Sequence, residues 1–439
     1  MAAPQTRDEA AASTFYTHRM ANGLQLVGQR MPDLESVAVC FYVRTGARDE
    51  HDPALYGVSH FLEHMVFKGT ARRDTEQITL DFNRMGAEFN AFTSTEQTVY
   101  YAHVLGEYLP NAIDLLADMM RPRLDAGDFD LERNVILEEI ARSEDTPMSQ
   151  ASRKLLATYF AGQSLGHEVL GTRESIRDMS VEQMRAYWAR RYAANNLVLA
   201  VAGNFEWERV LELAREKCGD WATGEEGREA RPFTPAGGSA HVIVKPKQQQ
   251  QIMLAAWPSV SLEDKDFYAA VLGATVLGDG SGSRLFWNIF QKGLAETVFA
   301  TLYPFDNTGM MLTVVNTTPE HAPAVRELVA AELRGMQEDG VREDELRRAK
   351  DKLVSHTVLD GESAYSRMRD LASTWVIEGR LRSIEDEMRE IEAVTVEDVR
   401  RVLDRFPLTQ PQVFLAYGPL EAAAFELDAA SVETDEGAQ

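Results

Sequence analysis

An internal repeat with a period near 215 residues limits the fold of this 439-residue chain more than any other feature of its sequence. The segment Ser180–Arg185 (SVEQMR) matches Thr395–Arg400 (TVEDVR), 215 positions later. Both segments are typical of helix starts, because Ser or Thr precedes the helix and Gln or Asp stands at its third position. An apolar segment typical of a buried strand follows each copy, at Leu199–Gly203 and at Phe414–Gly418.

A third pair of segments keeps nearly the same offset, since Leu109–Ile113 resembles Ala322–Arg326. A chance match would not repeat at several places, so the chain is interpreted as one domain of roughly 210 residues that was duplicated. We expect an N-terminal domain over residues 15–223 and a C-terminal domain over 240–428. Residues 224–239 are rich in Gly, Pro and charge without periodicity, which predicts a linker.

Each half opens with predicted strands, and helical patterns, further strands and further helices follow. The opening strands are expected over residues 24–29 and 37–44 in the first half, and over 241–245 and 251–256 in the second. Strands and helices do not alternate regularly as they do in βαβ units. The pattern therefore favours the α+β class, with helices on one face of a largely antiparallel sheet in each half.

Charge and cysteine content exclude several classes of protein. The chain has 69 acidic and 45 basic residues and a formal charge of −24, which argues against binding to nucleic acid or anionic lipid. Cys40 and Cys218 are the two cysteines of the sequence, too few for a disulfide scaffold or a cysteine zinc cluster. No run of 18 apolar residues is present, so we expect no membrane span.

The first 13 residues are polar and rich in Ala, without a basic and then apolar targeting pattern. Small residues after Met1 favour a mature chain whose signal peptide has been removed. We therefore expect a periplasmic protein, and a frayed cytoplasmic terminus is the alternative.

The main chemical signal lies in Gly57–Phe67 (GVSHFLEHMVF). Apolar residues recur there at the spacing of an amphipathic helix: Val58, Phe61, Leu62, Met65 and Val66. His60 and His64 stand four residues apart on the other face, so both imidazoles can reach one zinc ion. Glu63 lies beside them, where it can take a proton from water. This is an H-x-x-E-H motif. The alternative is a solvated polar face with two ordinary histidines.

A catalytic zinc site needs a third protein ligand, and the helical segment Leu131–Ile140 offers one. Glu132 and Glu139 share one face of this helix two turns apart. Glu139 could bind zinc while Glu132 supports a ligand or the water. Glu138 is the rival ligand, although it projects about 100° away from Glu139. Taken alone, the segment is more typical of a solvated acidic helix.

Three motifs together resemble the pitrilysin-type inverzincins, in particular the branch of mitochondrial processing peptidase and its bacterial relatives. They are Gly57–Thr70 (GVSHFLEHMVFKGT), Gly86–Tyr101 (GAEFNAFTSTEQTVYY) and Glu132–Glu139, and the resemblance extends over nearly the whole chain. It implies two similar α/β-roll domains that form a half-shell. It also implies a zinc metalloendopeptidase that hydrolyses extended or unfolded peptides inside a closed chamber.

The same resemblance implies a role for each residue of the site. His60, His64 and Glu139 would bind one zinc ion per chain. Glu63 would be the general base, and Glu132, seven residues before the third ligand, would assist it.

A strand close to the zinc would hold the substrate. Asn90, Ala91, Phe92 and Thr93 are expected to form an edge strand, which can pair with an extended peptide. The resemblance implies this role, and an ordinary core strand is the alternative.

The C-terminal half departs from the family pattern. Family members with a complete site carry an Arg there and, seven residues later, a Tyr after Gly-Leu-Ala or Gly-Leu-Gly. In this chain Ile289 and Glu296 occupy those positions, and neither stabilises an oxyanion by donating a hydrogen bond at neutral pH. We therefore expect a heterodimer whose homologous partner supplies the Arg and the Tyr. The alternatives are a self-sufficient homodimer, another local residue such as Tyr303, or a non-catalytic scaffold like the core subunits of respiratory complexes.

Overall fold

The computed structural model of this chain describes residues 14–228, 233, 238–427 and 430–434. Two six-stranded sheets are present, each in its own compact unit. The first unit comprises Met1–Ile136, Val169–Arg228 and Val358–Ile384; the second comprises Leu137–Glu168, Glu229–Thr357 and Glu385–Gln439.

The first sheet has the strand order β1-β2-β6-β3-β5-β4. Its strands are β1 (Thr14–Arg19), β2 (Gln25–Arg30), β3 (Ser36–Val43), β4 (Glu88–Thr93), β5 (Thr98–Leu105) and β6 (Leu197–Gly203). Neighbouring strands are antiparallel except for β2 and β6, which are parallel. The strand β4, which was expected to lie at an edge, is the last strand of this sheet.

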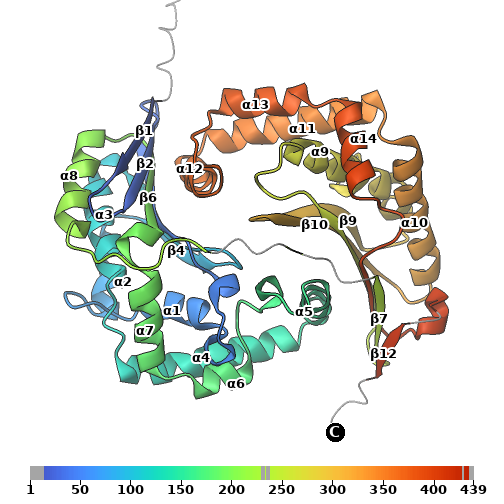
Figure 1. Cartoon of the computed structure of the whole chain (residues 1–439), viewed down its shortest axis with the longest axis horizontal. Coiled ribbons are helices and arrows are strands. Elements are labelled where there is room, and N and C mark those ends of the chain that lie inside the picture. The colour runs from blue at the N-terminus through green and yellow to red at the C-terminus, as the bar shows by residue number, and fades with distance from the viewer. Residues whose placement is uncertain (1–13, 229–232, 234–237, 428–429, 435–439) are drawn as a thin grey trace, which may run out of the picture. The chain divides into compact units, whose positions relative to one another are not determined.

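Helices cover both faces of the first sheet. They are α1 (Val58–Val66), α2 (Thr75–Arg84), α3 (Leu109–Met119), the first part of α4 (Ala126–Glu144), α6 (Arg173–Asp178), α7 (Val181–Arg191), α8 (Trp207–Cys218) and α12 (Ala364–Glu378). Figure 1 shows α3 and α8 on one side of β2 and β6 and α12 on the other. The helix α12 belongs to the second half of the sequence, yet Met368 and Leu371 are buried against Val27 and Ala200 of this sheet.

The second sheet has the strand order β12-β7-β11-β8-β10-β9. Its strands are β7 (Ser239–Val244), β8 (Gln251–Ser259), β9 (Thr297–Phe305), β10 (Thr308–Thr317), β11 (Val413–Gly418) and β12 (Ser431–Thr434). The strands β12, β7 and β11 run parallel, and the remaining pairs are antiparallel.

Helices also cover both faces of the second sheet. They are α5 (Pro147–Tyr159), α9 (Phe267–Gly278), α10 (Ala322–Asp339), most of α11 (Glu343–Gly361), α13 (Ile384–Ala393), α14 (Val396–Arg405) and the short helical turns η6 (Phe286–Phe290) and η7 (Ala422–Phe425). The helix α5 comes from the first half of the sequence and buries Leu155 and Tyr159 against Leu254 and Leu415. Figure 1 shows α10 beside β10 and β7.

The α+β class and the two similar, largely antiparallel sheets predicted from the sequence are confirmed. The duplicated helix starts are present as well, since Ser180 and Thr395 cap α7 and α14 with reciprocal hydrogen bonds to Gln183 and Asp398. The prediction placed helices on one face of each sheet. A helix from the other half of the sequence covers the second face in each case.

The division into domains 15–223 and 240–428 stays a prediction, because the compact units exchange the segments that carry α5 and α12. The predicted linker lies partly within residues 229–232 and 234–237, outside the described residues. The first 13 residues, on which the expected export rests, are also outside them. No described helix is long and apolar enough to cross a bilayer.

Candidate metal centre

The helix α1 presents its polar stripe as the amphipathic pattern predicts. Its apolar residues are buried: Val58, Phe61, Leu62, Met65 and Val66. His60 and His64 lie on the opposite stripe, one turn apart, with ring centroids separated by 4.7 Å. The sequence pattern thus places the two imidazoles side by side.

A buried carboxyl group fixes the start of α1. Gly57 precedes the helix with φ +87°, and a Cβ atom there would lie 2.6 Å from the carbonyl oxygen of Leu170. Its N–H donates to Glu50 at 2.7 Å, and the N–H of Ser59 donates to the same carboxyl at 2.8 Å. Burial raises the pKa of Glu50 to about 8, although these two donors act against the rise. Glu50 therefore holds two of the N–H groups that α1 cannot satisfy by itself.

The helix α4 brings a third ligand group to the two histidines. One ligand atom each from His60, His64 and Glu139 lies within 4.8 Å of the others. Glu139 follows Glu132 by two turns on one uninterrupted helix, so α4 positions both carboxylates. Glu138, the rival ligand, is exposed and does not belong to this group of described residues.

Glu132 orients the imidazole of His64 through a hydrogen bond at Nδ1. Its Oε1 lies 2.8 Å from Nδ1 of His64, and its Oε2 lies 2.6 Å from Nζ of Lys68. Burial alone would raise the pKa of the Glu132 carboxyl, but the hydrogen bonds from His64 and Lys68 outweigh it and hold the pKa below its ordinary value. A carboxylate at this place favours a proton on Nδ1 of His64 and leaves Nε2 available for a metal.

His60 is suited to metal binding by its protonation state. Burial, with a smaller contribution from His64, lowers the pKa of His60 to about 4. The imidazole is therefore neutral at physiological pH, and a histidine must be neutral to bind a metal through its ring nitrogen.

Glu63 is held by the edge strand β4. The hydroxyl group of Thr93 donates to Oε2 of Glu63 at 2.6 Å. The predicted substrate-binding segment Asn90, Ala91, Phe92 and Thr93 forms the last part of this strand. The N–H of Ala91 donates to the side chain of Asn90. The strand therefore lies beside the predicted base.

The donor set fits zinc better than a hard cation such as Mg²⁺ or Ca²⁺. Two imidazole nitrogens and one carboxylate oxygen suit zinc, and three protein ligands leave one position of a tetrahedron open.

Comparison with known proteins agrees with this geometry. Residues 26–173 match the model of "Insulinase (Peptidase family M16)", and residues 178–353 match that of "Peptidase M16 inactive domain". An uncharacterized zinc protease of Mycobacterium tuberculosis (strain H37Rv) is 35% identical over 406 residues, which cover 90% of this chain and 91% of the relative. The chain belongs to peptidase family M16. This confirms the resemblance to the pitrilysin-type peptidases.

Other M16 proteins support the assignment. The uncharacterized zinc protease YmxG of Bacillus subtilis is 30% identical over 86% of this chain and 92% of its own length. Among solved structures, a peptidase M16 inactive domain from Pseudomonas fluorescens superposes with a TM-score of 0.86 at 22% identity, covering 93% of this chain and 98% of that one. A protease from Helicobacter pylori gives a TM-score of 0.85 at 20% identity, covering 92% and 99%. At these identities the two structures show the M16 fold alone.

The two positions at which the sequence departs from the expected family pattern, Ile289 and Glu296, both lie in the second unit. Ile289 is fully buried in the apolar core of that unit, within the π-helical turn η6. Its neighbour Phe290 is exposed instead. The carboxylate of Glu296 accepts a hydrogen bond from the side chain of Gln250. Neither position holds the Arg or the Tyr of a complete site.

Three contacts of this M16 site were missed by sequence reasoning. Lys68 lies four residues after His64, within the quoted motif, and this spacing could have suggested its position beside Glu132. Thr93 was predicted to bind substrate, and its hydrogen bond to Glu63 was not predicted. Glu50 stands in a charged run, and no pattern there indicates that it caps α1.

Proposed function

We propose that this chain is the zinc-bearing subunit of a metalloendopeptidase that hydrolyses extended or unfolded peptides. The observation that carries the proposal is the cluster of His60, His64 and Glu139, whose ligand atoms lie within 4.8 Å of one another. The names of the M16 relatives as zinc proteases support zinc as the metal. One zinc ion per chain would be bound by these three residues.

The residues around the metal have separate tasks in this proposal. Zinc, when bound, lowers the pKa of water and polarises the scissile carbonyl group. Glu63 takes the proton from the attacking water and passes it to the leaving amine. The hydroxyl of Thr93 keeps the Glu63 carboxylate in one orientation, because it donates to Oε2 at 2.6 Å. Glu132 keeps His64 in the correct tautomer.

The substrate would lie along β4. An extended peptide can add to the edge of a sheet through main-chain hydrogen bonds, and β4 is the edge strand that carries Thr93. Asn90, Ala91 and Phe92 would then contact the peptide backbone and its alternate side chains.

A homologous partner would complete the site. A developing oxyanion needs hydrogen-bond donors, and this chain has a buried Ile289 and an acidic Glu296 where complete M16 sites have Arg and Tyr. We propose that the partner brings this pair and that the chain alone is nearly inactive. A homodimer that uses Tyr303, which is 44% exposed on β9, is the alternative enzyme.

A non-catalytic scaffold is the alternative from another class. The fold is shared with a chain of "Complex III2 from Candida albicans", with a TM-score of 0.80 at 18% identity, covering 94% of this chain and 97% of that one. The intact donor set favours the enzyme, because a scaffold has no use for two histidines and a carboxylate within 4.8 Å of one another.

Hydrolysis of unfolded peptides tests the proposal. The purified full chain is assayed alone and together with the homologous M16 protein of its source cell. The mixture is assayed again after zinc has been removed and after zinc has been restored. We expect turnover with the partner, loss of turnover on chelation and recovery with zinc. Turnover that survives complete removal of metal contradicts a zinc peptidase, and full turnover of the isolated chain contradicts the need for a partner.

A further inference from the structure

The second unit contains a truncated copy of a helix that is complete in the first unit. The strand β6 ends at Gly203 and β11 at Gly418, and the two strands occupy the same place in the order of their sheets. In each unit the next helix starts four residues later, α8 at Trp207 and η7 at Ala422. The two helices therefore begin at equivalent positions.

The copies differ in length. The helix α8 has 12 residues, and its later turns bury Leu213, Ala214 and Cys218. By contrast, η7 ends after four residues at Phe425. Glu426 then adopts a left-handed conformation with φ +51°, and the described chain continues to β12. The last two turns of α8 thus have no counterpart among the described residues of the second unit.

Smaller side chains lie on the sheet where this helix is missing. In the first unit Leu26 and Phe41 are fully buried, and the ring of Phe41 lies 5.5 Å from that of Trp221, just after α8. Both residues pair with Leu199 of β6, and the repeat matches Leu199 with Phe414 of β11. The residues that pair with Phe414 are Ala240 and Ala255, which are therefore the counterparts of Leu26 and Phe41. Truncation of the helix and of these two side chains leaves a pocket.

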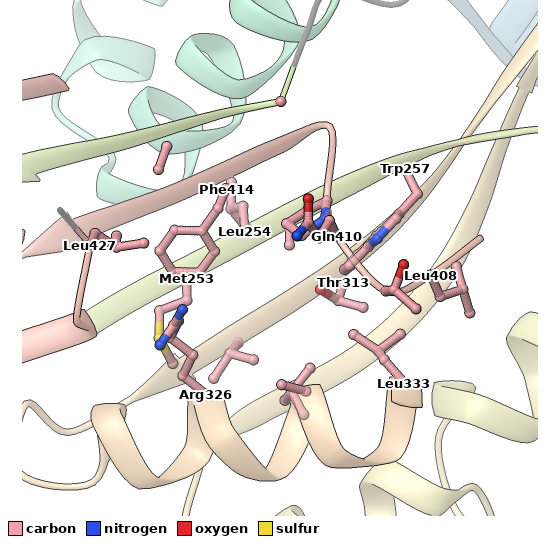
Figure 2. Close-up of a pocket in the computed structure, with 18 of the residues that line it drawn as sticks. Met253, Leu254, Trp257, Thr313, Arg326, Leu333, Leu408, Gln410, Phe414 and Leu427 are labelled. Carbon is pink, nitrogen blue, oxygen red and sulfur yellow. The ribbon is translucent and has the colours of Figure 1, made fainter. Parts of the chain in front are cut away.

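The pocket has a volume of about 600 Å³ and lies between α10 and the sheet. Figure 2 shows Arg326 projecting from α10 toward Met253 and Phe414, and Leu333 projecting from the same helix toward Thr313 and Leu408. Trp257 also lines it, and its buried indole N–H has no hydrogen-bond partner among the described residues. The lining therefore combines apolar side chains with the unpartnered indole N–H of Trp257 and with an ion pair between Arg326 and Glu327 at 3.2 Å.

The helix α10 carries residues of the same charge as those that contact α8 and the segment after it in the first unit. In the first unit, Asp114 of α3 pairs with Lys217 of α8 at 3.0 Å, and the guanidinium of Arg121 lies 3.8 Å from the ring centroid of Trp221. The repeat matches Asp114 with Glu327 and Arg121 with Arg334. Both of these residues line the pocket.

We propose that this pocket is the docking site for an amphipathic helix of a partner protein. The helix has about three turns, as α8 does, and lays its apolar stripe between α10 and the sheet. A basic side chain near its C-terminal end pairs with Glu327, and an aromatic ring beyond that end stacks on Arg334. An acidic residue meets Arg326, which replaces Ile113 of the first unit. The proposal does not depend on the zinc site.

The test uses α8 itself as the probe. A fluorescent peptide of residues 205–222 with Cys218→Ser is titrated with the purified full chain, in which α8 already fills the equivalent place in the first unit. We expect saturable binding with a Kd on the order of 10 µM, because one short helix buries less surface than a stable interface of about 1,600 Å².

Two matched comparisons identify the site. Ala330→Arg fills the pocket and should weaken binding at least about tenfold, whereas Ala331→Arg, one residue further on the exposed face of α10, should leave it unchanged. The peptide with Lys217→Glu should bind more weakly to the natural chain, and Glu327→Lys in the protein should restore its binding.

Three results would overturn the proposal. The first is no saturable binding at peptide concentrations up to about 1 mM, a weak limit for any specific contact. The second is an equal effect of Ala330→Arg and Ala331→Arg, which would place the peptide elsewhere. The third is binding of the Lys217→Glu peptide that Glu327→Lys does not improve, because the helix would then not lie as α8 does.

Discussion

Nδ1 of His64 lies 2.8 Å from Oε1 of Glu132, so the helix that carries the third ligand group also orients one of the histidines. The other carboxylate oxygen of Glu132 contacts Lys68 at 2.6 Å. Both oxygens of the carboxylate are thus held, one by His64 of the H-x-x-E-H motif and the other by Lys68, four residues after it. This arrangement explains why an acidic residue stands two turns before Glu139.

Glu132→Gln should weaken zinc binding by about 10- to 100-fold, the usual effect of losing the partner of a metal-binding histidine. The amide is a weaker acceptor for His64 and cannot form the ion pair with Lys68. Competition with a chromogenic zinc chelator measures the affinity. Glu138→Gln, on the exposed side of the same helix, is the control and should bind zinc as the natural chain does.

Thr93→Val should lower the kcat of the partnered enzyme by about 10- to 100-fold, because a hydrogen bond to a charged group contributes about 1.5–3 kcal/mol. The shape of the side chain is kept and the donor to Glu63 is lost. Zinc content should not change. Thr301→Val, on the edge strand β9 of the second sheet, is the matched control, and an equal loss in both variants would remove the assigned role of Thr93.

Glu50→Ala should destabilise the first unit by about 2–4 kcal/mol, since two buried N–H groups lose their acceptor. Thermal unfolding followed by calorimetry measures the change. Glu50→Gln keeps one acceptor oxygen and should be affected less. If Glu50→Ala unfolds at the same temperature as the natural chain, the carboxyl does not anchor α1.

The stability contributed by Glu50 should depend on pH. Burial raises the pKa of this carboxyl from its ordinary value of 4.5 to about 8. Between these values the folded chain keeps a proton that the unfolded chain has lost, so the contribution is full below pH 4.5 and is lost as the pH rises through about 8. The natural chain should therefore lose its advantage in unfolding temperature over Glu50→Gln as the pH rises from 4.5 to about 8. A difference that stays constant contradicts this assignment.

Local patterns predicted the helix starts and the position of the histidines because these features depend on residues close in the sequence. Ser180 and Thr395 cap helices through a residue three positions away. His60 and His64 share a stripe because they lie one helical turn apart. Glu139 was found by the same reasoning, since its spacing from Glu132 is a helical one.

Features that depend on distant parts of the chain were not predictable in this way. An amphipathic helix does not specify its sheet, so the exchange of α5 and α12 has no local signal. Ile289 lies in the π-helical turn η6 and is buried in the core of the second unit, where its burial depends on packing against residues distant in the sequence. The contact between Thr93 and Glu63 joins a strand to a helix 30 residues away.

Zinc content of the purified full chain tests whether His60, His64 and Glu139 bind one metal ion. The natural chain and the variants Glu63→Gln, His64→Ala and Glu139→Gln are supplied with zinc, dialysed and analysed by native mass spectrometry. We expect one zinc ion in the natural chain and in Glu63→Gln, since Glu63 is assigned to proton transfer and not to metal binding. We expect none in His64→Ala or Glu139→Gln. Equal zinc content in all four proteins, or none in the natural chain, would contradict this assignment.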